Sequence, residues 1–403
     1  MNVLFLTLID FKSFNERNIY CDLLREFIKN GHNVYAISPT EKRNSIDTHL
    51  SEDGRLLKLK IGNTQKTNIV EKGISTLMIE PQFVSAIKKY FSNVKFDLVL
   101  YSTPPITLAG AVKYVKKRDG AKTYLMLKDI FPQNAVDLGM MTKTGPKSIL
   151  YKYFRKKEEA LYAFSDKIGC MSQANVDFVL KNNPAVDENK VEICPNAIEP
   201  QDMSVSEEER TELRNKYGIP LDKKVFVYGG NLGKPQGIPF IIECLKTQEN
   251  NDNAYFLIVG DGTEYGKLEE YFNAAAPKNM KLMKRLPKDD YDRMIAACDV
   301  GMIFLDHRFT IPNFPSRLLS YMQAGLPVLA CTDPNTDVGK VITEGGFGWW
   351  CESNDANAFA SIITNIADYD YSAAKNNEKE YLYSNYTAEC TAKIIEKNFI
   401  LIN

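Results

Sequence analysis

The stretch IFLDHRFTIPNFPSRLLSYMQAGLPVLACTDP, from Ile303 to Pro334, combines a strand, a helix and a second strand. The apolar letters IFL predict a buried strand, Pro315-Ser316-Arg317 begin an amphipathic helix, and after Gly325 the letters PVLA predict the second strand. Free backbone N–H groups, a serine hydroxyl and an arginine at the start of a helix are groups that bind phosphate. Arg317 could instead be a solvated charge on the helix. We favour phosphate contact, because Arg317 follows the polar loop that carries Asn313.

Two glycine-rich turns lie upstream of this stretch. YGGNLGKPQG (228–237) and VGDG (259–262) each follow an apolar strand and precede a helix. The glycines could merely form tight turns, and Asp261 could merely cap a helix. The polar residues of the first turn favour ligand contact, and three such turns in one α/β half suit a nucleotide diphosphate. We therefore assign donor binding to Gly230, Asn231, Gly233, Gln236, Gly260, Asp261, Gly262, Asn313 and Ser316.

Composition excludes several classes of protein. The chain has 403 residues, of which 44% are hydrophobic and 25% charged, and this is typical of a globular protein with two domains. Its net charge of −1 argues against nucleic-acid binding. Three histidines without ligand spacing and eight cysteines without a CxxC pair argue against a zinc site. Because a signal peptide and a membrane-spanning run are both missing from the sequence, we expect a cytoplasmic protein, either free or at a membrane face.

Short apolar runs alternate with helical periodicity, which predicts an α/β fold with parallel sheets. We expect strands at 3–8, 34–38, 98–102, 123–127, 167–170, 225–228, 256–259, 300–304 and 328–330, and helices that include 18–30, 74–91 and 106–118. We expect KVEICPNAIEP (190–200) to be a strand followed by two prolines, which indicate a linker near 196–204. We therefore expect two doubly wound, Rossmann-like domains, 1–198 and 199–385, that face a central cleft. A last helix within about 386–403 is expected to pack back on the first domain.

Four segments carry a resemblance to a known family: LKDIFPQNAVDLG (127–139), VYGGNLGKPQG (227–237), FLIVGDG (256–262) and PSRLLSYMQAGLPVLA (315–330). In this order and spacing, and together with NERNIYCDLLREFIKNGHNV (15–34), they resemble the retaining glycosyltransferases of family four, which have the GT-B architecture. The similarity is to the subgroup that builds bacterial O-antigen and capsule repeat units, including N-acetylfucosamine transferases.

The chain also departs from that family. Most of the superfamily holds the donor diphosphate with an Arg and a Lys, five residues apart, where this chain has Asn231 and Gln236. The paired glutamates of the family align with Pro312 and Ser320. The cations available to the diphosphate are then Lys234 and Arg317. Donor contacts at Leu286 and Ser320 complete the expected donor site.

The resemblance implies transfer of a sugar, in the leading case an N-acetyl-deoxyhexosamine, from a UDP-sugar to a polyprenyl-diphosphate-linked saccharide in surface polysaccharide synthesis. It implies retention of anomeric configuration, no metal or other cofactor, and work at the inner membrane surface. Arg317 and Lys234 would stabilise the departing diphosphate. Two alternatives stay open: a sugar-nucleotide 2-epimerase, and a non-catalytic nucleotide-binding partner of a transferase. The donor base, the sugar, the acceptor and the linkage are not fixed by the sequence.

In the first half of the chain, Asp129 closes the apolar strand TYLMLK, which would place a carboxylate at the cleft end of that strand. It could accept the proton of the acceptor hydroxyl, or it could only cap a turn. Arg17 and Asn18, at the start of the first helix, could bind the acceptor or cap that helix.

The segment KTGPKSILYKYFRKK (143–157) mixes six basic residues with aliphatic and aromatic ones. As a helix it could lie in a bilayer interface, with its lysines near anionic headgroups. It could equally pack an aromatic stripe against the core and expose a solvated basic face. A lipid-linked acceptor would give the first arrangement a purpose.

Overall fold

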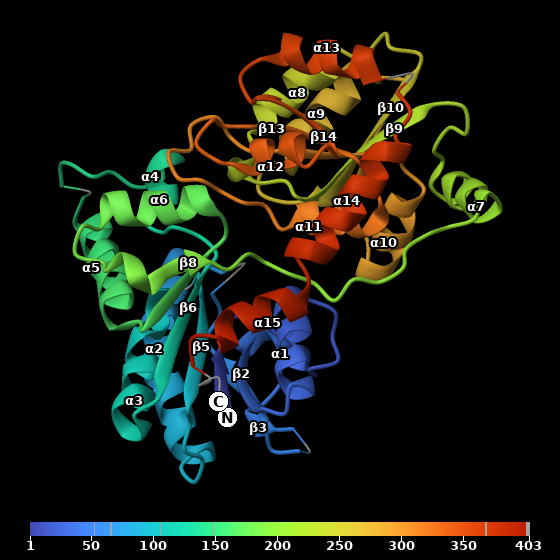
Figure 1. Cartoon of the computed structure of the whole chain (residues 1–403). Coiled ribbons are helices and arrows are strands. Elements are labelled where there is room, and N and C mark those ends of the chain that lie inside the picture. Colours follow the sequence, from blue (N-terminus) through green and yellow to red (C-terminus); the bar gives the residue numbers. More distant parts are fainter. Residues whose placement is uncertain (52, 65–66, 105, 147, 367–368, 400–403) are drawn as a thin grey trace. The chain divides into compact units, whose positions relative to one another are not determined.

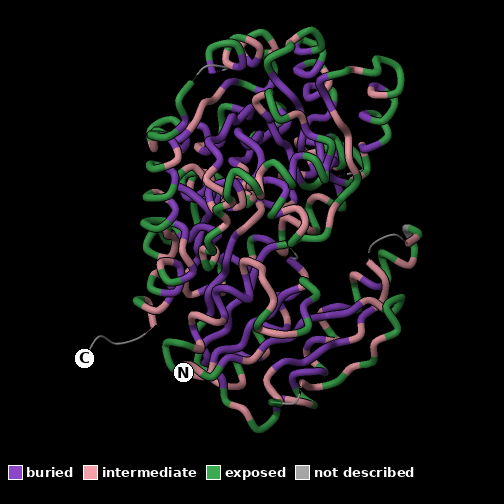
Figure 2. The backbone as a smooth tube through the Cα atoms, turned by 90° about the vertical axis from the view of Figure 1, so that its right-hand side faces the viewer, coloured by how far each residue is buried: buried purple, intermediate pink, exposed green. Residues whose placement is uncertain are grey.

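The computed structural model describes residues 1–51, 53–64, 67–104, 106–146, 148–366 and 369–399 (Figure 1). The chain divides into two compact units. Unit 1 comprises Met1–Glu199 together with the segment that begins at Ala388, and unit 2 comprises Pro200–Thr387. The strands of both units are largely buried, whereas their helices and loops carry the exposed residues (Figure 2).

Unit 1 is built on a sheet that has eight strands within the described ranges, in the order β3-β4-β2-β1-β5-β6-β7-β8. Only β3 is antiparallel to its neighbour; the other pairs are parallel. The strands are β1 (Asn2–Leu6), β2 (Asn33–Glu41), β3 (His49–Leu50), β4 (Leu56–Ile61), β5 (Leu98–Thr103), β6 (Lys122–Leu127), β7 (Lys167–Cys170) and β8 (Val191–Ile193). The connecting helices are α1 (Ile19–Lys29), α2 (Ile69–Tyr90), α3 (Ala109–Asp119), α4 (Gln133–Asp137), α5 (Ser148–Phe164) and α6 (Gln173–Asn182).

Helix α15 (Ala388–Glu396) returns to unit 1 and packs against α1, as Figure 1 shows. Its Ala392 and Ile395 are fully buried in the same apolar cluster as Phe27 of α1. Glu396 accepts a hydrogen bond from His32, with 3.1 Å between Oε1 and Nε2. Apolar burial therefore holds this helix in unit 1, although 188 residues of unit 2 (200–387) precede it in the chain.

Unit 2 contains a parallel sheet with six strands among the described residues, in the order β11-β10-β9-β12-β13-β14. These are β9 (Lys224–Asn231), β10 (Ala254–Asp261), β11 (Met280–Lys284), β12 (Val300–Phe304), β13 (Val328–Thr332) and β14 (Gly348–Glu352). The helices are α7 (Glu207–Tyr217), α8 (Ile238–Lys246), α9 (Tyr265–Ala275), α10 (Lys288–Ala296), α11 (Arg317–Ala324), α12 (Val338–Glu344), α13 (Ala356–Ile366) and α14 (Ser372–Asn385).

Besides the two-residue β3, the sequence expectations passed over three strands: β4 (LLKLKI), β11 (MKLMK) and β14 (GWWCE). Lysines interrupt the first two, so neither reads as an apolar run. In β4 one of the two lysines is nevertheless buried: Lys58 Nζ donates hydrogen bonds to Asp10 Oδ1 at 2.6 Å and to Ser38 Oγ at 3.0 Å. A buried charge that finds such partners is tolerated inside a sheet.

Candidate functional site

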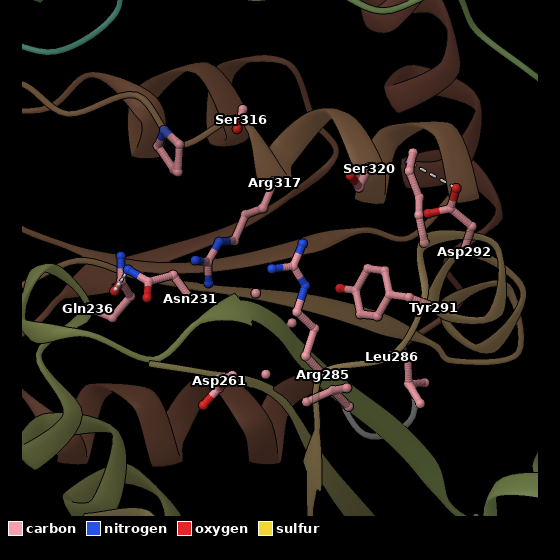
Figure 3. Close-up of a pocket in the computed structure, with 16 residues that line it drawn as sticks. Asn231, Gln236, Asp261, Arg285, Leu286, Tyr291, Asp292, Ser316, Arg317 and Ser320 are labelled. Atoms are coloured by element: carbon pink, nitrogen blue, oxygen red, sulfur yellow. Dashed lines mark hydrogen bonds and ion pairs between the residues drawn. The ribbon is translucent and has the colours of Figure 1, made fainter. Parts of the chain in front are cut away.

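A cavity of about 670 Å³ lies at the carboxyl end of the unit 2 sheet (Figure 3). The ends of β9 and β10, the loop after β11, helix α10 and the start of α11 form its walls. The lining residues are Gly229, Gly230, Asn231, Gln236, Val259, Gly260, Asp261, Arg285, Leu286, Lys288, Tyr291, Asp292, Pro315, Ser316, Arg317 and Ser320. The carboxyl edge of a parallel sheet is where such folds bind ligands.

The glycines in this wall allow backbones and side chains to approach closely. A Cβ on Gly260 would lie 2.0 Å from the carbonyl oxygen of Gly230, and one on Gly229 would overlap the ring of Tyr291. Gly230 has φ of +127°, a conformation that residues with a Cβ rarely adopt. These positions need glycine so that β9, β10 and α10 can enclose the cavity.

The turn after β9 is closed by side-chain amides. Gln236 Oε1 accepts hydrogen bonds from Asn231 Nδ2 at 3.1 Å and from the backbone N–H of Gly233 at 3.2 Å. Gln236 is buried, so these bonds fix the shape of the turn. The turn thus offers polar groups to the cavity, and neither Asn231 nor Gln236 carries a charge.

Arg317 is the first residue of α11 and points into the cavity (Figure 3). Its guanidinium lies over the ring of Tyr228, 4.2 Å from the ring centroid. One helical turn later, Tyr321 Oη accepts a hydrogen bond from the N–H of Gly229 at 3.1 Å, which ties α11 to β9. Nη1 of Arg317 is buried and has no hydrogen-bond partner within the described part of the chain. The guanidinium is therefore oriented by stacking while Nη1 stays available to a ligand.

Arg285, in the loop after β11, extends toward the same space as Arg317 (Figure 3). Among the described residues, neither guanidinium forms an ion pair with a carboxylate. Of the two carboxylates in the wall, Asp292 pairs with Lys288 at 3.0 Å, and Asp261 Oδ1 accepts the N–H of Gly262 at 2.9 Å. Two like charges that converge without a counterion favour an anionic ligand.

Comparison with known proteins identifies the class of enzyme. Residues 209–382 match the family model described as glycosyl transferases group 1. The probable glycosyltransferase WbjE of Pseudomonas aeruginosa is 26% identical over 330 residues, which cover 81% of this chain and 80% of the relative. The chain is a glycosyltransferase. A relative from Escherichia coli K12, WcaI, named as a colanic acid biosynthesis glycosyl transferase, is 22% identical over 251 residues, 61% of this chain and 60% of the relative.

Solved structures show the fold of this glycosyltransferase. HepE of Anabaena has a TM-score of 0.68 at 15% identity, over 99% of both chains. WaaG, a glycosyltransferase involved in lipopolysaccharide biosynthesis, has a TM-score of 0.66 at 15% identity, over 98% of this chain and 99% of that one. The two parallel-sheet α/β domains have the GT-B fold, which confirms the fold class predicted from the sequence.

The cavity of the glycosyltransferase includes nine of the residues singled out from the sequence: Gly230, Asn231, Gln236, Gly260, Asp261, Leu286, Ser316, Arg317 and Ser320. Four other unit 2 residues from that set do not line it: Gly233, Lys234, Gly262 and Asn313. Lys234 lies in the 3-10 turn Lys234–Gln236 and is exposed. A Cβ on Gly262 would lie 2.4 Å from the carbonyl group of Leu232, so that glycine serves packing.

Sequence reasoning missed Arg285, Lys288 and Tyr291, which also line the cavity. All three follow β11, the strand that the lysines of MKLMK concealed. Recognition of that strand would have marked RLPKDD (285–290) as a turn from a strand to a helix at the same sheet edge as the glycine turns.

In unit 1, Asp129 lies between β6 and α4. Its Oδ2 accepts a hydrogen bond from Asn134 Nδ2 at 2.7 Å, whereas Oδ1 is buried and has no partner among the residues that the structure describes. Burial raises the pKa of the Asp129 carboxyl to about 6. The carboxyl therefore titrates nearer to neutral pH than an exposed aspartate does, which suits a group that accepts a proton.

The two expected acceptor residues lie at the start of α1. Asn18 is the N-cap of this helix, and its Oδ1 accepts hydrogen bonds from the N–H groups of Tyr20 and Cys21 at 3.0 and 2.9 Å. The capping interpretation of Asn18 is therefore correct, and an acceptor contact by Arg17 or Asn18 stays a prediction.

Segment 143–157, in which residue 147 lies outside the described residues, packs partly on the protein, and contact with a bilayer stays a prediction. Phe154 packs on Phe131, with 5.0 Å between ring centroids, and Arg155 Nη1 bonds Glu158 at 2.5 Å, so part of α5 faces the protein. Ile149 and Leu150 are exposed instead. In the described parts of the chain, no helix is long and apolar enough to cross a membrane, and no group of three His, Cys, Asp or Glu residues could hold a metal ion.

Proposed function

We propose that this glycosyltransferase moves a sugar, in the leading case an N-acetyl-deoxyhexosamine, from a UDP-sugar to a polyprenyl-diphosphate-linked saccharide, with retention of configuration. The observation that carries the donor assignment is the convergence of Arg317 and Arg285 on one cavity without a carboxylate partner among the described residues. HepE of Anabaena, which shares the fold, was crystallised with UDP and with UDP-glucose, and this supports a uridine nucleotide as the donor group.

The donor diphosphate would lie between the two guanidinium groups. Arg317 is pre-oriented by Tyr228, so it can follow the charge that develops on the leaving diphosphate with little loss of side-chain entropy. Asn231 and the N–H groups at the start of α11 would add neutral hydrogen bonds. The nucleoside would lie toward Leu286 and the end of β10. In this proposal the arginines neutralise the diphosphate and no metal ion is required.

In the reaction, the acceptor hydroxyl forms a bond to the anomeric carbon on the face from which the diphosphate departs. The bond between the anomeric carbon and the diphosphate oxygen breaks, and the electron pair leaves with the diphosphate. The hydroxyl proton passes to a leaving phosphate oxygen or to Asp129, whose pKa of about 6 leaves most of it ionised at neutral pH. Products are the extended saccharide and the nucleoside diphosphate.

The proposed acceptor class and place of action are supported by the names of similar proteins. WcaI is named for colanic acid biosynthesis and WaaG for lipopolysaccharide biosynthesis, which supports work in the synthesis of a bacterial surface polysaccharide, such as O-antigen or capsule. The family resemblance implies an acceptor linked to a lipid carrier, so the enzyme would act on the inner face of the cell membrane, as a cytoplasmic, peripheral protein.

The test is direct. The purified protein is incubated with UDP- or GDP-linked sugars and a lipid-diphosphate saccharide, the mass of the product is measured, and its anomeric configuration is read by NMR. A UDP-sugar should give an extended lipid-linked product with the donor configuration. Conversion of the sugar nucleotide to its isomer without an acceptor would identify an epimerase instead. Donor binding without turnover of any acceptor would contradict the proposal in favour of a non-catalytic partner.

A further inference from the structure

The two halves of the unit 2 sheet meet between β9 and β12. From β9 the chain builds β10 and β11 on one side, and it then crosses to build β12, β13 and β14 on the other. Strand β9 pairs with β10 along its whole length. Its register with β12 covers only Phe226 with Val300 and Val227 with Gly301, although both strands continue beyond these residues. Such sheets bind ligands where the strand order reverses, and the sheet separates early at that point.

The hydroxyl of Tyr321 lies where the two strands separate. Tyr321 Oη accepts a hydrogen bond from the N–H of Gly229 at 3.1 Å. It donates to the carbonyl oxygens of Val227 at 3.2 Å and of Met302 at 3.1 Å. Two of these backbone groups belong to β9 and the third belongs to β12. One side chain of α11 therefore satisfies backbone groups of both strands at the point where their direct pairing ends.

The surroundings of the Tyr321 ring leave room for it. The ring is fully buried, and a Cβ on Gly301 would lie 2.4 Å from Tyr321 Cγ. Gly301 therefore lets the ring pack directly on β12. Burial raises the pKa of the Tyr321 hydroxyl to about 12, so the group keeps its proton at neutral pH and can act as a donor.

Arg317 lies one helical turn before Tyr321, on the same side of α11. Its guanidinium points into the cavity (Figure 3) and stacks on the ring of Tyr228 in β9, 4.2 Å from the ring centroid. A Cβ on Gly230 would lie 3.3 Å from Arg317 Nη2. The guanidinium therefore lies along the end of β9, which is the segment that the hydroxyl of Tyr321 holds.

We propose that Tyr321 is a positioning residue for sugar transfer: its hydroxyl fixes α11 to both strands where they separate, so that Arg317 is held where the leaving diphosphate develops charge. The inference rests on the proposed function and adds a residue that is not among those that line the cavity. Tyr321 touches no substrate in this proposal and acts through Arg317. Its hydrogen bonds to the two strands fix direction as well as distance, which the packing of a ring alone does not.

The test is Tyr321→Phe, which keeps the ring and removes the hydroxyl. With saturating UDP-sugar and lipid-diphosphate saccharide, kcat should fall roughly tenfold to a hundredfold, because a small displacement of Arg317 removes much of its effect. The KM for the donor should change less than kcat. A double-mutant cycle with Arg317→Ala is the decisive measurement. If Tyr321 acts through Arg317, loss of the hydroxyl should lower the rate little further once the guanidinium is absent.

The matched control is Tyr371→Phe. Tyr371 is also buried in unit 2, and its Oη donates to the carbonyl oxygen of Ile366 at 2.8 Å, so this variant loses a similar hydrogen bond away from the cavity lining. Calorimetric scans should show a lower Tm for both variants, whereas kcat should fall only in Tyr321→Phe. The proposal is overturned if Tyr321→Phe has a lower Tm and the parent kcat, or if the rate losses in the cycle are additive.

A second variant decides the matter if Tyr321→Phe does not fold. Gly301→Ala keeps the hydroxyl but pushes the Tyr321 ring away from β12, because the added Cβ would overlap that ring. It should lower kcat and show the same non-additivity with Arg317→Ala. A folded Gly301→Ala enzyme with the parent rate would overturn the proposal.

The inference and the proposed function can fail separately. A parent protein that binds UDP but turns over no UDP-sugar contradicts the proposed function, and the same cycle is then measured on the Kd for UDP by calorimetric titration. Non-additive losses of affinity in Tyr321→Phe and Arg317→Ala would support the positioning role, and additive losses would overturn it. Turnover by the parent and equal turnover by Tyr321→Phe would leave the proposed function standing and remove Tyr321 from it.

Discussion

The side-chain amide of Asn231 donates a hydrogen bond to Oε1 of Gln236, 3.1 Å away, across the turn that follows β9. These are the two positions at which the family resemblance expects an arginine and a lysine. Here they bind each other and give the turn its shape, so neither of these two positions carries a charge. Positive charge reaches the cavity from other elements, through Arg317 of α11 and Arg285 after β11.

Gln236→Glu should weaken donor binding roughly tenfold or more, because a carboxylate would then face the diphosphate. The acceptor oxygen for Asn231 and Gly233 is retained, so the turn should keep its shape. Calorimetric titration with UDP and with the UDP-sugar measures the effect. Gln201→Glu, at an exposed position, is the matched control. Unchanged affinity for UDP in a folded Gln236→Glu protein would mean that the diphosphate lies elsewhere.

Arg317→Ala should lower kcat by roughly tenfold to a thousandfold, because the guanidinium stabilises charge that appears as the diphosphate leaves. Arg317→Lys keeps the charge but loses the planar stacking on Tyr228, and it should recover only part of the rate. Steady-state kinetics under saturating donor distinguish kcat from KM. Arg293→Ala, which removes a surface ion pair with Glu209, serves as the control. Full activity in Arg317→Ala would remove this residue from the mechanism.

Arg285→Ala should raise KM for the donor more than it lowers kcat, since Arg285 lies in an exposed loop and water can replace it in part. The double variant Arg285→Ala, Arg317→Ala tests whether the two arginines act on one group. A double-mutant cycle should give non-additive losses if both contact the same diphosphate. Strict additivity would indicate that they bind separate parts of the donor.

Because of Asp129, the plot of reaction rate against pH should have an acid limb, in which the rate falls as the pH drops below about 6. Burial raises its pKa to about 6, so the carboxylate gains a proton as the pH falls through that value and can no longer accept one from the acceptor. The rate should therefore decline below pH 6, and Asp129→Asn should be slow with no such limb. A variant that keeps both the rate and the acid limb would show that the proton goes to the leaving phosphate.

Glu378 should destabilise the folded protein at neutral pH. It is fully buried in α14, neither carboxylate oxygen has a hydrogen-bond partner among the described residues, and burial raises its pKa well above the ordinary value. Because the folded state retains a proton that the unfolded state has lost, stability falls as pH rises above the unfolded pKa of about 4.5.

Glu378→Gln removes this ionisation, so the Tm should increase at pH 7 and depend less on pH between 5 and 8. Each kcal/mol of added stability corresponds to roughly 2–4 °C in a domain of this size. Calorimetric scans of parent and variant across that range measure both effects. Glu380→Gln, at an exposed position of the same helix, is the control. A variant with a lower Tm than the parent at every pH would show that the carboxyl has a stabilising partner.

Chelation should leave turnover unchanged, since in the proposed mechanism Arg317 and Arg285 supply the charge that divalent metals supply elsewhere. The measurement is product formation with and without EDTA. Loss of activity that returns on addition of Mg²⁺ or Mn²⁺ would contradict this part of the mechanism. The same assay on Arg285→Ala separates the two sources of charge, because a metal-assisted reaction would tolerate that substitution.

Much of the wall of the unit 2 cavity could be predicted from the sequence, for a local reason. The strand ending in YGGNLG, the strand ending in VGDG and the helix that begins at Arg317 each show their own pattern of apolar residues, glycines and caps. In a parallel sheet such turns meet at one edge whatever the details of packing. Nine of the residues assigned to the donor or to catalysis therefore line the cavity.

What the sequence could not supply depended on which strand lies beside which, and on how side chains are oriented. Lys234 is three residues from Asn231, but its turn directs it to solvent, whereas Arg285 reaches the cavity because β11 pairs with β10 at the edge of the sheet. Lysine interrupts both β4 and β11, and only tertiary contacts decide that such segments are strands. Local sequence patterns therefore determined most strands and helices and the edge of the sheet at which the cavity lies. Long-range strand pairing and burial decided which charged side chains face that cavity. The physical reason is that a charge can attract a ligand only where its neighbours leave it without a partner.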